Sequence, residues 1–87
     1  MMLQNVLVVD DRTEIRDLMV QVLKQRGYQV STVSDGHDAL TQSALPRPDF
    51  VITDLTMPGL NGYQLCRLIR GISSVPALVM SAQMGVE

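Results

Sequence analysis

Three apolar runs, each of which stops at a polar residue, constrain this chain more than any other feature. The runs occupy residues 6–9, 50–53 and 77–80, and the residues that follow them are Asp10 with Asp11, Asp54, and Ser81. Near-continuous runs of valine, leucine and isoleucine are typical of strands that are covered on both faces of a parallel sheet. Because parallel strands joined by right-handed crossovers end at the same edge, we expect these polar residues to share one site there.

The rest of the chain alternates between expected strands and expected helices. The strands are residues 5–10, 28–33, 49–54 and a stretch after Pro76, with 28–33 more polar and therefore at an edge. The gaps between them are long enough for the helical crossovers that parallel strands need. The expected fold is therefore α/β with a doubly wound parallel sheet.

Apolar residues at helical spacing place a helix in the gaps. The first helix stops at Gly27, the second spans residues 36–44, and the third begins at a capping Asn61 with Gln64 three residues later. One apolar stripe is expected on the first helix, formed by Ile15, Leu18, Met19, Val22 and Leu23. The expected buried face of the third helix consists of Leu65, Leu68, Ile69 and Ile72.

Composition excludes several classes of function. With 46% hydrophobic and 18% charged residues, the 87-residue chain is expected to be one globular domain. A net charge of −2 without a basic stripe lacks the footprint of a nucleic-acid binder, so no direct nucleic-acid contact is expected. No apolar stretch reaches the roughly 20 residues of a membrane span, so we expect no membrane partner and a cytoplasmic location. The single Cys66 is expected to be a packed side chain, and the lone His37 a solvated residue at a helix start.

Asp10, Asp11 and Asp54 converge in this interpretation, and their charges need a partner. Two carboxylates about 4 Å apart at an effective dielectric constant of about 20 repel each other by roughly 4 kcal/mol. Such a cluster takes up a proton or a cation. Oxygen ligands without histidine or cysteine favour a hard ion, and a partly hydrated Mg²⁺ is the natural occupant. The ion would also offset the charge of a phosphoryl group and leave one carboxylate free as a nucleophile.

Each polar residue also has an interpretation that needs no ligand. Asp11, with Glu14 three residues later, is equally well placed to cap a helix, and both roles can coexist. Asp54 can form an Asx turn before Thr56, and Ser81 can bond to the backbone at a strand end. The functional interpretation therefore depends on these residues meeting at one edge of the sheet.

The motifs resemble those of one known family. Val8-Val9-Asp10-Asp11, the Asp-x-x-Met-Pro-Gly-x-x-Gly segment at residues 54–62, and Val79-Met80-Ser81-Ala82 resemble the receiver domain of bacterial two-component response regulators. The resemblance covers essentially the whole chain and implies a flavodoxin-like fold of the chemotaxis-regulator type, truncated after strand four. Residues 1–87 are then expected to be one receiver domain that is incomplete at its C-terminus. The family's fifth strand and fifth helix would lie past Glu87, and no lysine after Lys24 matches the lysine that opens the fifth strand.

The resemblance implies a role for each residue of the site. Asp54 is the expected phosphoacceptor, which takes a phosphoryl group from a sensor histidine kinase or a phosphotransfer protein. Asp10 and Asp11 are the expected Mg²⁺-site acids, with Asp11 as the direct ligand and Asp10 acting through water. Asp54 and the backbone carbonyl of Thr56 complete the metal shell. Ser81 matches the switch hydroxyl that turns toward the phosphoryl group. Such a domain is not an enzyme, although it takes part in its own phosphorylation and dephosphorylation.

The expected function is therefore Mg²⁺-dependent phosphoacceptance in two-component signal transduction, and two alternatives stay open. Because the switch lysine has no counterpart, the chain could be a non-switching receiver fragment that acts as a protein-interaction module. A hydrolase of the haloacid dehalogenase type also uses a strand-end aspartate with Mg²⁺, but its Asp-x-Asp pattern is absent. The first strand begins almost at Met1, which favours a receiver at the N-terminus of a response regulator. A sheet that stops at strand four would leave an open apolar edge, through which two copies could pair as a homodimer.

Overall fold

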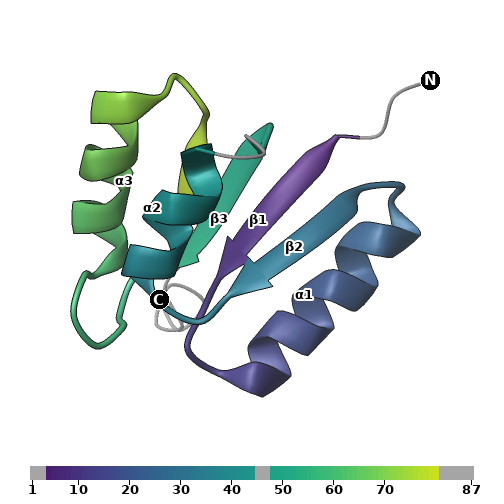
Figure 1. The fold of residues 1–87 in the computed structure, drawn as a ribbon. Coiled ribbons are helices and arrows are strands. Elements are labelled where there is room, and N and C mark those ends of the chain that lie inside the picture. Colours follow the sequence, from purple (N-terminus) through teal and green to yellow (C-terminus); the bar gives the residue numbers. More distant parts are fainter. Residues whose placement is uncertain (1–3, 45–47, 81–87) are drawn as a thin grey trace.

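The computed structural model describes residues 4–44 and 48–80, in which strands and helices alternate (Figure 1). The strands are β1 (Asn5–Val9), β2 (Gln29–Val33), β3 (Phe50–Asp54) and β4 (Ala77–Met80). The helices are α1 (Thr13–Gln25), α2 (Gly36–Ala44) and α3 (Gly62–Ile72). Every predicted element is confirmed, and the strand ends shift by no more than one residue.

The strands form one parallel sheet in the order β2-β1-β3-β4. β2 and β4 are the edges of the described sheet, as the polar sequence of β2 predicts. From β1 the chain passes outward to β2 and then returns across β1 to β3, so the strand order reverses between β1 and β3. In open α/β sheets, ligands bind outside the carboxyl ends of the strands at such a reversal.

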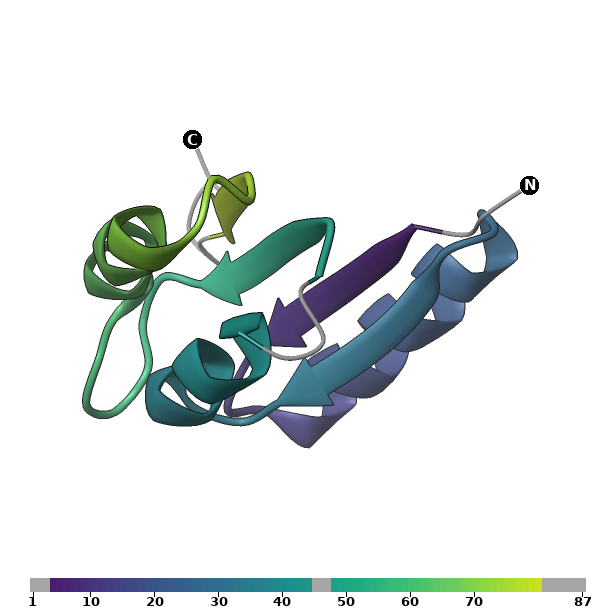
Figure 2. The ribbon, with the colours of Figure 1, turned by 45° about the horizontal axis from the view of Figure 1, so that its top comes forward.

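The helices cover the two faces of the sheet unequally (Figure 2). α2 and α3 lie side by side on one face, whereas α1 lies on the other face. Alternate residues of β1 and β3 supply the two cores: Leu7, Val9 and Val51 on the side of α2 and α3, and Val6, Val8 and Ile52 on the side of α1. With helices on both faces, the chain has the doubly wound α/β fold that its sequence predicts.

The apolar stripes of α1 and α3 are only partly buried. Met19 and Leu23 pack against the sheet from α1, and Leu65 and Ile69 are fully buried on α3. Leu18 and Val22 of the apolar stripe on α1 are about half exposed, and so are Leu68 and Ile72 on α3. The prediction of a buried face was therefore wrong for Leu68 and Ile72. Helical spacing identifies one side of a helix, but burial also needs an element that covers the full width of that side.

Hydrogen bonds at the helix ends confirm the predicted caps. Gly27 has a φ of 92°, and its N–H donates to the carbonyl of Lys24 at 3.0 Å, so α1 stops there. At the start of α3, the N–H of Gln64 donates to Oδ1 of Asn61, and the N–H of Asn61 donates to Oε1 of Gln64, both at 2.9 Å. This reciprocal pair is the predicted capping box, and it fixes where the loop after β3 becomes a helix.

The fold also tests three expectations about single features. His37 is exposed near the start of α2, and Cys66 is a buried thiol on α3, as predicted for both. Burial raises the pKa of Cys66 above its ordinary value, which keeps the thiol protonated. Within residues 4–44 and 48–80, no helix has the length and apolar character needed to cross a membrane.

Candidate functional site

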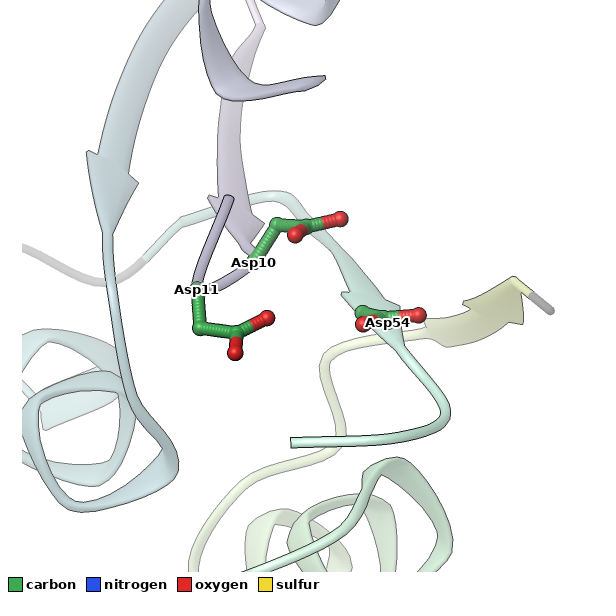
Figure 3. Close-up of side chains that lie close together, drawn as sticks. All are labelled: Asp10, Asp11 and Asp54. Carbon is green, nitrogen blue, oxygen red and sulfur yellow. The ribbon is translucent and has the colours of Figure 1, made fainter. Parts of the chain in front are cut away.

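Three carboxylates meet at the carboxyl edge of the sheet, where the strand order reverses (Figure 3). Asp10 and Asp11 directly follow β1, and Asp54 is the last residue of β3. One oxygen atom from each carboxylate lies within 4.8 Å of the others. The predicted convergence of these residues is therefore present in the fold.

The three acids differ in their exposure to solvent. Asp10 is completely buried and Asp54 is 5% exposed, whereas Asp11 is exposed. The backbone positions of the buried pair are fixed by hydrogen bonds from the sheet. The N–H of Asp10 donates to the carbonyl of Val33 at 3.2 Å, and the hydroxyl of Thr53 donates to the carbonyl of Asp54 at 3.0 Å. The site thus has two fixed, buried carboxylates and one at its mouth.

Arg12 supplies the positive charge closest to these acids, and sequence reasoning missed it. Its Nε lies 3.1 Å from Oδ1 of Asp10, and its Nη2 lies 3.2 Å from Oδ2 of the same carboxylate. The Nη2 atom is also 3.8 Å from Oδ1 of Asp54. A signal was present in the sequence, because an arginine directly after an Asp-Asp pair can fold back onto it.

The charge balance at Asp54 sets its protonation. Burial raises the pKa of Asp54 above the ordinary value, and the neighbouring Asp10 carboxylate raises it further. Arg12 and a hydrogen bond from the backbone N–H of Thr56 act in the opposite direction and lower the pKa of Asp54. The net shift of the pKa is upward, so Arg12 and Thr56 together do not outweigh burial and the Asp10 carboxylate.

The loop after β3 is packed tightly under Asp54. The N–H of Gly62, the first residue of α3, donates to the carbonyl of Leu55 at 2.8 Å. A Cβ atom at Gly62 would lie 2.5 Å from the carbonyl oxygen of Asp54 and 2.9 Å from the Cα of Leu55. Only glycine fits there, which explains the glycine that ends the Asp-x-x-Met-Pro-Gly-x-x-Gly segment.

The structure also tests the interpretations that need no ligand. The N-cap of α1 is Arg12, which makes no side-chain capping bond, so the prediction that Asp11 caps this helix was wrong. The Asx-turn interpretation of Asp54 is confirmed in part, because Asp54 does accept a hydrogen bond from the N–H of Thr56. Thr56 is exposed in the loop after β3, and Ser81 lies outside the described residues.

The donor set of this cluster fits a hard cation. It offers carboxylate oxygens at the described positions and neither histidine nor cysteine within the group. Asp10 and Asp54 are both buried and have one described counter-ion between them, the guanidinium of Arg12. A small, oxygen-seeking ion such as Mg²⁺ fits these requirements.

The fold and the site together define a class of protein: a doubly wound α/β domain with an acidic cluster at the reversal point of its sheet. The chain belongs to the response regulator receiver domain family, whose family model matches residues 6–87. This assignment removes the haloacid dehalogenase alternative.

Curated and structural relatives agree with the family. The chain is 39% identical over 82 residues to the DNA-binding response regulator MtrA of Mycolicibacterium paratuberculosis, a match that covers 94% of this chain and 36% of that protein. The chain therefore spans about a third of that relative's length. The chemotaxis response regulator CheY4 of Vibrio cholerae is similar in structure, with a TM-score of 0.85, 33% identity, and coverage of 90% of this chain and 68% of that chain.

A third relative was solved together with a partner protein. The crystal structure of histidine kinase ThkA in complex with response regulator protein TrrA contains a chain similar to this one, with a TM-score of 0.87 and 32% identity. The match covers 92% of this chain and 70% of that chain.

Proposed function

We propose that this chain is the phosphoacceptor module of a two-component signalling system, in which Asp54 receives a phosphoryl group from a histidine kinase or a phosphotransfer protein. The observation that carries the proposal is the cluster of Asp10, Asp11 and Asp54 at the reversal point of the sheet. Membership of the receiver family supports it, and so does the similarity to a chain from a complex between a kinase and a response regulator.

Asp54 is the nucleophile in this proposal. One of its carboxylate oxygens forms a bond to phosphorus while the bond between phosphorus and the donor's histidine nitrogen breaks, and the nitrogen keeps the electron pair. Asp54 is positioned for this step because its backbone is held by Thr53 and its carboxylate by the N–H of Thr56. The chain is a signalling module that takes part in its own phosphorylation and dephosphorylation, not an enzyme with a separate substrate.

The neighbouring oxygens would hold Mg²⁺. Asp10, Asp11 and Asp54 would supply carboxylate oxygens, and Thr56 a backbone carbonyl. When bound, Mg²⁺ offsets the negative charge that a phosphoryl group brings to an already acidic site. The two buried carboxylates are fixed by the sheet, which keeps the acidic side chains in place before a donor arrives.

The same proposal includes a role for Ser81 and a cellular location. The hydroxyl of Ser81 is proposed to turn toward the phosphoryl group after transfer and thus to report phosphorylation to the surrounding chain. The proposed setting is the cytoplasm, where a histidine kinase presents its phosphorylated histidine.

The test is phosphorylation by a small-molecule donor. The full chain is incubated with acetyl phosphate and Mg²⁺, and the adduct is detected by mass spectrometry and by its lability to hydroxylamine, which cleaves acyl phosphates. We expect one adduct on the wild-type chain, none with Asp54→Asn and none when EDTA replaces Mg²⁺. Asp17→Asn, which removes an exposed acid from α1, is the matched control and should still form the adduct. An adduct that survives Asp54→Asn would refute the assignment.

A second candidate is a protein-interaction module that does not respond to phosphorylation. The contact of Arg12 with both Asp10 and Asp54 favours it, because the acidic site already has an internal cation. The two functions differ in one readout: affinity for a histidine kinase changes on phosphorylation of Asp54 in a switching receiver and stays constant in the second candidate.

A further inference from the structure

Arg12 is placed unusually for a residue at the N-terminus of a helix. It is the N-cap of α1, with extended backbone angles (φ −98°, ψ 120°), and it makes no side-chain cap. Short polar side chains such as serine, threonine, aspartate and asparagine are favoured at an N-cap because they accept hydrogen bonds from the first turn. A guanidinium group can only donate, and its positive charge is unfavourable at the positive end of the helix dipole.

Contacts with the acidic cluster compensate for this unfavourable position. The carboxylate of Asp10 accepts three hydrogen bonds from Arg12: from its backbone N–H at 2.9 Å, from Nε at 3.1 Å and from Nη2 at 3.2 Å. Two of them form a bidentate fork, the strongest arrangement between arginine and a carboxylate. The same Nη2 lies 3.8 Å from Oδ1 of Asp54, so the positive charge of one side chain is shared between both buried acids.

We propose that Arg12 is an internal cation of the acidic site, and that a divalent cation binds only when the Arg12 side chain leaves the carboxylate of Asp10. This inference rests on the proposed function, because it concerns the cation that the same site would hold. Both oxygens of Asp10 are engaged by Arg12, so neither is free for a metal ion or for a water molecule that the ion holds. A guanidinium and a divalent ion at the same carboxylate would also repel each other.

The side chain has a route out of the site. Its solvent-exposed fraction is 44%, whereas the Asp10 side chain beneath it is completely buried. Arg12 can therefore swing into water without moving the sheet. The metal-free domain then keeps the Asp10 carboxylate paired with a cation, and metal uptake replaces the guanidinium with a divalent ion.

The test compares the Mg²⁺ affinities of variants of the full chain by isothermal titration calorimetry. We expect Arg12→Ala to bind Mg²⁺ with a Kd about threefold to tenfold lower than wild type, because the metal no longer displaces a charge-assisted fork of a partly exposed pair. Arg16→Gln is the matched control. Arg16 also bonds to Asp10, through Nη1 at 2.7 Å, but to the backbone carbonyl and not to the carboxylate. The Arg16→Gln substitution removes the same charge one helical turn away and should change the Kd for Mg²⁺ by less than about twofold.

A second readout follows the arginine itself. In EDTA, the hydrogen on Nε of Arg12 should exchange slowly with water, as followed through its ¹⁵N-correlated NMR signal. This protection should disappear in Asp10→Asn or on saturation of the wild type with Mg²⁺. Equal Mg²⁺ affinities for wild type and Arg12→Ala would overturn the competition and leave the proposed function intact. Absence of Mg²⁺ binding in wild type and in Arg12→Ala would overturn both the competition and the magnesium requirement of the proposed function.

Discussion

The Nη2 atom of Arg12 lies 3.8 Å from Oδ1 of Asp54, so the proposed phosphoacceptor shares its only described counter-ion with Asp10. Asp54 is nevertheless held in a site that disfavours its charge, because burial and the Asp10 carboxylate raise the pKa of Asp54. In the absence of metal, the ionised Asp54 therefore lowers the stability of the fold.

Replacing Asp54 by asparagine should raise the free energy of unfolding in EDTA. A carboxyl group with a raised pKa binds more protons in the folded than in the unfolded state, so stability falls as pH rises from the ordinary value of 3.8 through the folded-state pKa. At pH 7 we expect Asp54→Asn to unfold at a higher urea concentration than wild type, because asparagine brings no charge into the buried position. The difference in stability between Asp54→Asn and wild type should vanish at pH values below 3.8, the ordinary pKa of an aspartate. Urea denaturation followed by circular dichroism measures this difference at pH 7 and at low pH, with Asp17→Asn as the control. A stability gain that does not depend on pH would contradict the charge argument.

Gly62→Ala and Gly71→Ala should have opposite effects although both substitutions lie on α3. At Gly62 the new Cβ would meet the backbone of Asp54 and Leu55, and such overpacking costs about 1–3 kcal/mol. At Gly71 a Cβ meets nothing within 4 Å, so alanine should stabilise the helix by up to about 1 kcal/mol. The urea denaturation midpoints of the two variants, compared with wild type, test this prediction. Loss of stability in both variants would show that α3 tolerates no alanine at either glycine and would contradict the steric argument.

The contribution of each hydrogen bond of the capping box at the start of α3 should be measurable from single substitutions. Asn61→Ala removes the acceptor for the N–H of Gln64, and we expect it to lower the free energy of unfolding by about 1 kcal/mol. Gln64→Ala removes only the reciprocal bond to the N–H of Asn61 and should cost less. Gln21→Ala, at an exposed position of α1, serves as the control and should lie within about 0.5 kcal/mol of wild type.

The outer edge of β4 should associate with a second copy of the chain. β4 is an edge of the described sheet, and Leu78 on it is 51% exposed. A charged side chain on an edge strand opposes such pairing, so Leu78→Lys should shift the chain toward monomer in sedimentation velocity at high concentration. Leu68→Lys places the same charge at a 44% exposed leucine of α3, away from the edge, and should leave the association unchanged. A wild-type chain that stays monomeric at every concentration would refute the homodimer.

Much of the fold and the core of the site could be predicted because they depend on local patterns. A strand that ends at an aspartate places that aspartate at the sheet edge whatever lies elsewhere, so Asp10 and Asp54 could be brought together from sequence alone. The capping box of Asn61 and Gln64 is equally local.

The rest depends on what lies opposite a residue in space. The contact of Arg12 with Asp54 joins segments far apart in the chain, so the local pattern of an arginine after an Asp-Asp pair indicates its contact with Asp10 but not its contact with Asp54. Leu68 and Ile72 were expected to be buried because their helical spacing is right, but no described element covers them fully. Periodicity gives the direction of a side chain and not the extent of its cover.

The thin cover that α1 gives to its face of the sheet affects how the acidic site exchanges cations. None of the 13 residues of α1, all of which the structure describes, is buried. A helix with so few buried contacts opens locally at low free-energy cost and protects its amides poorly from hydrogen exchange. Arg12, the N-cap of this helix, is hydrogen-bonded to Asp10, so release of the guanidinium also removes a contact that holds the N-terminal end of α1 in place. Loading of the site with metal should consequently appear as faster amide exchange along α1, although no residue of that helix is a proposed metal ligand.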